Sequence, residues 1–481
     1  GVACGYSGPS KIVDSRNAWQ DLLDMMTVLW KGDESRNIQS LGTHLWSPTV
    51  CSTITSIQLT NHQCLDFLKA LREPKNLQGH KPVDWMNIRS KDLSVAFESI
   101  LELVPSICSD TFAYSLSIKE GNARKSSGAY FTPDGLIDRV LQSTLVSSIH
   151  NAISNHPKPL QESALLALRV CDPSCGTGNF LVAASHLLAS TLTDIRMTTE
   201  SQWGDVYQGA LKDVVRLCIY GVDVNPLTVE VCKLILWLEL GCTNDDFTQF
   251  NDNIVCGNAL LGATSELIEK GIKTEYFELI SSHDDRKIRN TIAKNNRLDL
   301  KGLRCVQTGS KNYVRLLPEE QVILMADSVC ASLVWPKRAG WEIAPTHGEI
   351  LHIRQGKCNK VLRESIERLK DAYRFFHWHL AFPHIFAQGG FDVVIGNPPY
   401  LASRYLSKHH PYQRRAIPKI FETASGNWDI YVPFTELAMR ILKEGGYQAY
   451  VTPNKIIGAE YASVLHERIF FRHSMLEVHD Y

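Results

Sequence analysis

The tetrapeptide Asn397-Pro398-Pro399-Tyr400 could do specific chemistry, and it follows residues 391–396, an apolar run typical of a buried parallel strand. Two prolines fix φ and remove two N–H donors, so this turn would offer carbonyl acceptors with little freedom to move. Asn397 can accept a hydrogen bond through its amide oxygen, and Tyr400 offers a flat ring for a planar base. These features suit a turn that holds an exocyclic amino group while its nitrogen attacks a methyl donor. The alternative is a plain turn.

A glycine-containing segment, residues 172–180, lies where an expected strand gives way to an expected helix. Gly176 and Gly178 would let the backbone bend tightly and let a ligand approach it. The segment lacks the third glycine of the dinucleotide fingerprint and the lysine of a phosphate loop. With Asp172 at its start and Phe180 at its end, it fits a small zwitterionic cofactor better than a pyrophosphate.

Polar residues also end the next two expected strands. Asp223 could bind both hydroxyls of a ribose, or it could cap the helix that follows. Asn258 could read the edge of an adenine, or it could serve as a turn residue. Upstream, Thr132 and Pro133 are typical of a helix start, as N-cap and first helical residue. The residues before them, which include Tyr130, could fold over a bound cofactor.

The pattern also predicts the elements that must position these side chains. Expected strands alternate with expected helices, which favours a doubly wound α/β sheet. Strands are expected at residues 166–171, 217–222, 254–256, 391–396, 447–452 and 475–481. One helix is expected to begin at about residue 180, a second to end at residue 240 and a third to span residues 432–442, with a Gly-Gly turn at 445–446. Before them, helices are expected at 19–30, 62–71 and 91–104. We therefore expect an N-terminal helical domain (1–120), a cofactor half (121–262), an insertion (263–390) and a catalytic half (391–481).

Five of these motifs, taken in order, resemble those of γ-class N6-adenine DNA methyltransferases. They are residues 128–133, 172–180, 221–226, 257–262 and 397–400. The chain most resembles the large methylases of type IIG restriction–modification and related phage-defence systems, over roughly residues 85–481. The resemblance implies a Rossmann-like class I methyltransferase sheet, S-adenosyl-L-methionine as cofactor and no metal.

The resemblance also implies a role for each motif residue. Asp172, Gly176, Gly178 and Phe180 would cradle the methionine part of the cofactor, and Tyr130, Thr132 and Pro133 would close over it. Asp223 would hold the ribose and Asn258 the adenine. The target would be an adenine flipped out of double-stranded DNA, with its amine bound by Asn397 and the Pro398 carbonyl. Pro399 would complete the turn, and Tyr400 would stack on the base.

A basic segment follows this turn and contains Arg404, Lys408, Arg414, Arg415 and Lys419, with no acid between residues 404 and 419. Because it leaves the carboxyl end of the catalytic strand, a DNA-backbone contact is favoured over a merely solvated loop. The net charge of the whole chain is only −1, so any contact with DNA must be local.

Composition and the chain ends bear on the class of protein and on where it works. No apolar run approaches the roughly 18 residues of a membrane span. The 13 cysteines lack metal-ligand spacing, so we expect reduced thiols in a cytoplasmic, prokaryotic protein. The absence of an initial Met and of a recognition domain indicates a fragment, with other restriction or defence subunits as possible partners. The alternatives are methylation of a protein glutamine or of ribosomal RNA, and a catalytically silent cofactor-binding fragment of a defence complex.

Overall fold

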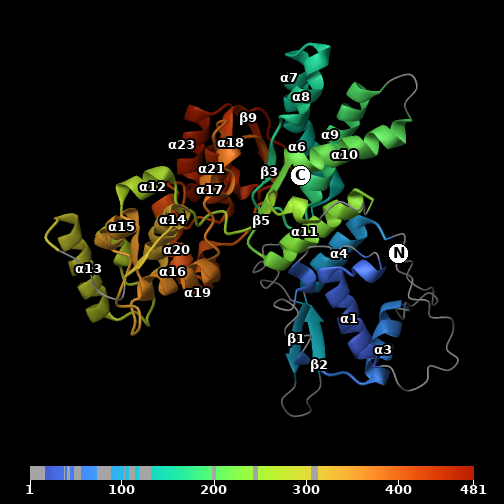
Figure 1. The fold of residues 1–481 in the computed structure, drawn as a ribbon. Coiled ribbons are helices and arrows are strands. Elements are labelled where there is room, and N and C mark those ends of the chain that lie inside the picture. Colours follow the sequence, from blue (N-terminus) through green and yellow to red (C-terminus); the bar gives the residue numbers. More distant parts are fainter. Residues whose placement is uncertain are drawn as a thin grey trace.

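A parallel five-stranded sheet forms the centre of the molecule in a computed structural model (Figure 1). The structure describes residues 17–36, 38, 40, 44–47, 56–72, 88–101, 103–107, 114–118, 132–197, 202–241, 247–304 and 313–480. The strand order is β5-β4-β3-β8-β9. These strands are β3 (Val170–Asp172), β4 (Ile219–Asp223), β5 (Ile254–Cys256), β8 (Phe391–Gly396) and β9 (Leu442–Tyr450). The order reverses between β3 and β8, so the predicted doubly wound sheet is confirmed and its ligand edge lies at the carboxyl ends of these strands.

Apolar side chains alternate between the two faces of β8, and each face contributes to a different core. Val393 and Ile395 belong to a core shared with the cofactor-half helices, whereas Phe391 and Val394 belong to a core shared with the insertion. Val393, Val394 and Ile395 show the period of two expected of a strand, and Phe391 departs from it across the register shift between Phe391 and Val393. The first layer contains α6 (Asp134–Ser143), α7 (Leu145–Ser154), α8 (Lys158–Leu166), α9 (Asn179–Arg196), α10 (Trp203–Cys218) and α11 (Pro226–Glu239). β3 and β4 begin later than predicted because α8 and α10 extend further.

The insertion supplies much of the layer on the other face of the sheet. Phe382 packs edge-on against both Tyr220 of β4 and Phe391 of β8, with ring centroids 5.5 and 5.8 Å apart. The insertion is mainly helical. Its elements are α12 (Ser265–Lys270), η6 (Thr274–Phe277), α13 (Arg286–Leu300), β6 (Tyr313–Arg315), α14 (Pro318–Val334), α15 (His347–Arg354), β7 (Lys357–Asn359), α16 (Lys360–Tyr373), α17 (Trp378–Ala381) and α18 (Pro383–Phe386).

The N-terminal region is helical only in part. Its helices are α1 (Ala18–Lys31), α3 (Asn61–Arg72) and α4 (Ser90–Leu101), with short 3-10 turns η1 (Glu34–Arg36) and η2 (His44–Trp46). The helix predicted through Val104 ends at Leu101, and β1 (Leu103–Ile107) then pairs with β2 (Tyr114–Ile118) in an antiparallel hairpin. Pro105 explains this correction, because a proline ends a helix and holds the residue before it in an extended conformation.

The C-terminal region departs from the prediction in two places. Gly445 and Gly446 lie inside β9 rather than in a turn before it. Leu442 pairs with Phe391 and Tyr447 pairs with Val393, so the glycines lie in an irregular bulge where Gly445 has φ 77°. The strand predicted at 475–481 is not observed: residues 475–480 have no regular structure and pair with none of the described strands, and Tyr481 lies outside the described residues. The remaining elements are α19 (Ser403–His409), α20 (Pro411–Ile420), α21 (Tyr431–Ile441), α22 (Lys455–Gly458), η7 (Glu460–Ala462) and α23 (Ser463–Arg472). Among the described helices, none has the length and apolar character needed to cross a membrane.

Candidate active site

Asn397, which follows β8 directly, is joined to Thr132 by a hydrogen bond across the edge of the sheet. The Asn397 Nδ2 donates to the Thr132 hydroxyl at 3.0 Å. Thr132 is 4% exposed. The prediction that Thr132 caps the next helix is wrong, as is the placement of Pro133 inside that helix: α6 begins at Asp134, and its N-cap residue is Pro133, which forms no side-chain cap. The hydroxyl instead fixes the Asn397 amide, so that its oxygen is directed away from Thr132.

The Tyr400 hydroxyl lies at the oxygen of that same amide. It is 2.5 Å from Asn397 Oδ1 and 3.0 Å from the carbonyl oxygen of Val451. A phenol has one proton, so it can donate to only one of these acceptors at a time. The ring is half-buried and meets Tyr431 edge-on, with centroids 6.0 Å apart. Sequence reasoning gave Tyr400 a stacking role alone and missed this hydrogen bond.

Asp172 lies between the glycine turn and the catalytic strand. Its carboxyl group is 1% exposed and accepts a hydrogen bond from the Ser174 N–H at 2.9 Å. Gly396 has φ 149°, and a Cβ added to it would lie 2.5 Å from Asp172 Oδ1, so only glycine fits there. Burial raises the pKa of Asp172 to about 7, and the charge of Asp223 adds to this rise. Asp172 therefore joins the predicted cofactor turn to Gly396, the residue before Asn397, through direct packing.

The glycine turn has the geometry that its sequence predicts. Gly176 and Gly178 have φ of 54° and 93°, values that disfavour residues with a side chain. The Gly176 N–H donates to Asp223 at 3.1 Å, and the Asn225 N–H donates to the other carboxylate oxygen at 2.8 Å. Asn225, not Asp223, caps α11. Burial raises the pKa of Asp223, and the two N–H donors oppose that rise.

Asn258 and Phe180 have structural roles in addition to the roles predicted for them. The Asn258 side chain accepts from the Leu260 N–H at 3.2 Å, as the alternative of a turn residue requires, and its own N–H donates to the Arg374 carbonyl at 2.7 Å. Phe180 is 4% exposed and lies in the apolar core beneath the glycine turn. Their contacts with a cofactor stay predictions. Tyr130 lies outside the described residues.

Helix α4 of the N-terminal region supports the same turn, a role for which sequence reasoning found no signal. The Ser94 hydroxyl is 2.5 Å from the Thr177 hydroxyl and donates to the Asn179 side chain at 3.0 Å. The Thr177 hydroxyl also donates to Glu98 at 2.8 Å. The N-terminal region is therefore directly attached to the predicted cofactor site.

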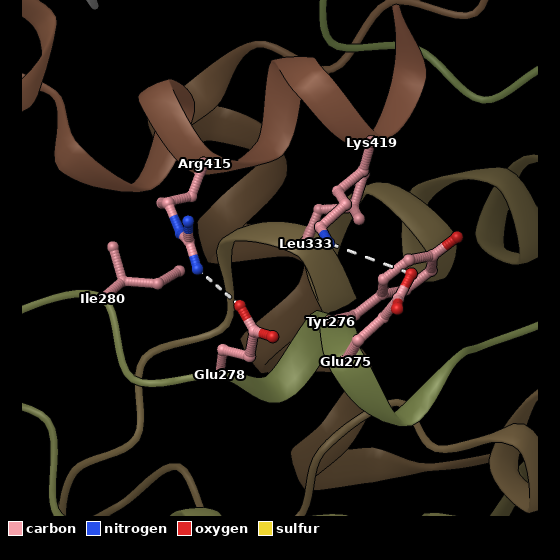
Figure 2. A pocket seen from close by; sticks show the side chains of 7 residues that line it. All are labelled: Glu275, Tyr276, Glu278, Ile280, Leu333, Arg415 and Lys419. Carbon is pink, nitrogen blue, oxygen red and sulfur yellow. Dashed lines mark hydrogen bonds and ion pairs between the residues drawn. The ribbon is translucent and has the colours of Figure 1, made fainter. Parts of the chain in front are cut away.

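The five basic residues after the turn fall into two groups. Arg404 and Lys408, on α19, are exposed. On α20, Arg415 and Lys419 point toward Glu278 and Glu275 of the insertion, at 2.5 and 3.8 Å (Figure 2). Arg414 stacks on Trp428 and donates to the Gly426 carbonyl at 2.6 Å.

The acids that neutralise α20 come from a segment well over 100 residues earlier in the chain, which explains why no local window reveals them. The DNA-contact prediction therefore keeps its strength for Arg404 and Lys408, and it is weaker for the three residues on α20.

The amino-acid sequence matches two protein-family models and several known proteins. Residues 217–481 match the family model described as Eco57I restriction-modification methylase, and residues 105–282 match the one described as N-6 DNA Methylase. A Methanocaldococcus jannaschii protein assigned as a type II restriction enzyme and methyltransferase, RM.MjaORFECS2P, is 24% identical over 432 residues, which cover 76% of this chain and 35% of that protein.

Two relatives match over shorter stretches. The Escherichia coli type II restriction enzyme and methyltransferase RM.Eco57I is 36% identical over 67 residues, which cover 14% of this chain and 7% of that protein. The Thermus thermophilus type II methyltransferase M.TthHB8I is 33% identical over 67 residues, covering 13% of this chain and 16% of that protein. The chain thus spans about a third of the length of the Methanocaldococcus relative.

Proposed function

Because the chain belongs to the Eco57I restriction-modification methylase family, we propose that it transfers a methyl group from S-adenosyl-L-methionine to N6 of adenine at a specific DNA site, within a restriction–modification or phage-defence system. The observation that carries this proposal is the hydrogen-bonded group of Thr132, Asn397 and Tyr400, which adjoins the Asp172 turn at the ligand edge of the sheet. This arrangement supports the proposed roles of Asn397 as amine acceptor and of the Asp172 turn as cofactor site.

The residues at the strand tips fit the proposed cofactor. Both oxygens of the Asp223 carboxylate already accept one backbone N–H, and each keeps a further lone pair for a ribose hydroxyl. Val224, next along the chain, is 52% exposed and offers an apolar surface to the adenine. Asp172 and the glycine turn would face the methionine part, and Thr132 and Pro133 would close it. When bound, S-adenosyl-L-methionine supplies an electrophilic methyl group.

Asn397 prepares the target nitrogen for attack. Adenine N6 is a poor nucleophile because its lone pair is delocalised into the ring. Acceptors at Asn397 Oδ1 and at the Pro398 carbonyl favour a pyramidal nitrogen with an exposed lone pair. Thr132 keeps the amide in the required orientation, and the Tyr400 proton turns to the Val451 carbonyl, which frees Asn397 Oδ1 for the amine. N6 would take the methyl group as its bond to the sulfonium sulfur breaks, which would leave S-adenosylhomocysteine, and N6 would release one proton to solvent. Rate enhancement comes from positioning and preorganised polar groups.

The target base must leave the duplex to reach this turn, at a cost of a few kcal/mol. Stacking on the Tyr400 ring would offset about 1–3 kcal/mol of that cost. Arg404 and Lys408, exposed on the helix that follows the turn, would hold the DNA backbone while the base is out.

The test is methyl transfer from labelled S-adenosyl-L-methionine to unmethylated DNA, with digestion to nucleosides to identify the product. We expect N6-methyladenine from the wild-type protein, and none from Asn397→Ala, although that variant should bind S-adenosylhomocysteine as the wild type does. Label on another base, on a protein glutamine or on RNA would contradict the proposal, as would undiminished turnover by Asn397→Ala. Cofactor binding without any methyl transfer would favour the silent fragment.

A further inference from the structure

A short segment of the insertion lies against the loop that follows β5. We call residues 374–378 the strap; they run from the C-cap of α16 to the first residue of α17. Asn258 and Phe375 form a parallel bridge, so the strap continues the pairing pattern of the sheet. Four hydrogen bonds join the two segments, the first of them within this bridge: Asn258 N–H to Arg374 O (2.7 Å), Phe376 N–H to Leu261 O (2.9 Å), Ala263 N–H to His377 Nδ1 (3.0 Å) and Trp378 Nε1 to Ala259 O (3.1 Å). The loop that carries Asn258 is therefore shaped by the insertion.

The loop admits the strap because of its glycines. A Cβ added at Gly262 would lie 1.9 Å from the Phe376 carbonyl oxygen. The strap is itself held firmly, because the His377 ring donates from Nε2 to Asp327 at 2.9 Å, and Lys370 binds the other oxygen of that buried carboxylate. Since His377 Nδ1 accepts from Ala263, the proton must reside on Nε2.

Arg374, the first residue of the strap, has an unusual backbone. Its φ is 53°, and within the described part of the chain it is the only residue other than glycine with positive φ. Helices commonly end in this conformation, but with Gly or Asn, because a Cβ disfavours it. Backbone outliers of this kind cluster at active sites and ligand-binding sites.

The Arg374 side chain is exposed at the carboxyl end of β5. Burial raises the pKa of Cys256, the last residue of β5, and the charge of Arg374 beside it opposes that rise. The Cys256 thiol in turn lies 3.7 Å from the Val224 carbonyl oxygen, next to Asp223. The guanidinium group therefore lies at the strand tips that bear the residues proposed for the ribose and the adenine.

We propose that Arg374 is a cofactor-binding residue supplied by the insertion, and that its guanidinium group contacts the adenine ring of S-adenosyl-L-methionine. The inference rests on the proposed function. A guanidinium group is planar and always charged, so it can stack on an aromatic base or donate to its ring nitrogens. The strap would hold Asn258 and Arg374 on the same base. The insertion is thus part of the cofactor site, although it interrupts the sheet in sequence.

Calorimetric titration of the full chain with two probes tests this. S-adenosylhomocysteine carries both halves of the cofactor, and 5′-methylthioadenosine carries only the adenosine half. Arg374→Gly removes the guanidinium group and accepts the positive φ, so the strap should keep its conformation, which thermal unfolding will check. We expect it to bind both probes about tenfold more weakly, a typical loss for one such contact. Arg374→Lys keeps the positive charge but lacks the planar guanidinium group, so its affinity for both probes should lie between those of the wild type and Arg374→Gly. The control is Lys360→Ala, at the exposed opposite end of the same helix, which should bind as the wild type does.

Three results would overturn the inference. If the wild type binds both probes and Arg374→Gly binds them equally well, the inference fails while the proposed function stands. If Arg374→Gly loses affinity for S-adenosylhomocysteine alone, Arg374 acts on the amino-acid half and not on the adenine. If the wild-type protein binds neither probe, the proposed function itself fails, and the inference fails with it.

Discussion

At the scale of single residues, the hydrogen bond between Asn397 and Thr132 fixes how the Asn397 amide, the proposed amine acceptor, is oriented. We expect Thr132→Val, which keeps the shape of the side chain but removes the hydroxyl, to lower the methylation rate at saturating cofactor about tenfold, the loss expected of one hydrogen bond that orients a reacting group. Thr132→Ser keeps the hydroxyl and should stay within about twofold of the wild type. Single-turnover methylation measures both. A loss in Thr132→Ser with none in Thr132→Val would mean that the methyl group matters and the hydroxyl does not.

The buried Asp172 carboxyl group makes the free energy of unfolding depend on pH. Burial raises its pKa to about 7 in the folded protein, from an ordinary value of 3.8, so the folded state binds more protons than the unfolded state between these values. Its contribution to the free energy of unfolding therefore falls as pH rises from about 4 to 7. We expect Asp172→Asn to be more stable than the wild type at pH 8, by a few kcal/mol at most, and equally stable near pH 4. Denaturant unfolding at several pH values measures this, with the exposed Asp138→Asn as control. A difference that does not change with pH would contradict it.

At the scale of elements, α19 and α20 differ in what their cations can do. Those of α20 already have partners within the protein, whereas Arg404 and Lys408 of α19 are exposed. Arg404→Ala with Lys408→Ala should reduce the slope of log K against log salt for DNA binding by about 2, because each lost phosphate contact removes about 0.9. The matched pair, Arg415→Ala with Lys419→Ala, should change the slope less. A larger change from the α20 pair would reverse this assignment.

Part of the arrangement of the candidate site could be predicted from the sequence. Asp172, Asp223, Asn258 and Asn397 lie at or just after the ends of separate strands, and the carboxyl ends of parallel strands share one edge, so their place on one edge followed from the alternation of strands and helices. The partner of Asn397 could not be foreseen, because Thr132 is 265 positions away and looks like a helix cap. Nor could a local window show that the insertion neutralises α20. The N-terminal hairpin was predictable in part, since a proline directly follows the proposed helix.

At the scale of the whole molecule, the insertion and the catalytic half share a buried charge. Lys337 is fully buried, its Nζ has no hydrogen-bond partner among the described residues, and it lies 5.7 Å from the centre of the Tyr412 ring. Burial lowers its pKa to about 8 from 10.5. The unfolded state therefore binds more protons between these values, and the penalty of burying the charge fades as pH rises through that window.

Lys337→Met should consequently raise the free energy of unfolding at pH 7 by about 1–3 kcal/mol. The gain should shrink as pH rises from 8 to 10.5. Denaturant titrations at pH 7, 9 and 10 measure it, with the exposed Lys360→Met as control. A loss of stability at pH 7 would show that the contact between Lys337 and Tyr412 outweighs the burial of the charge.

The insertion also leaves and re-enters the core at one place, because Ala263 and His377 are hydrogen-bonded to each other at 3.0 Å. The segment between these two residues is therefore a long loop whose ends are held together. Its closure entropy changes by only about 0.6 kcal/mol for each doubling of its length. Lengthening or shortening the outer helices, such as α13, should therefore hardly affect whether the sheet forms, provided that the closing contact is kept.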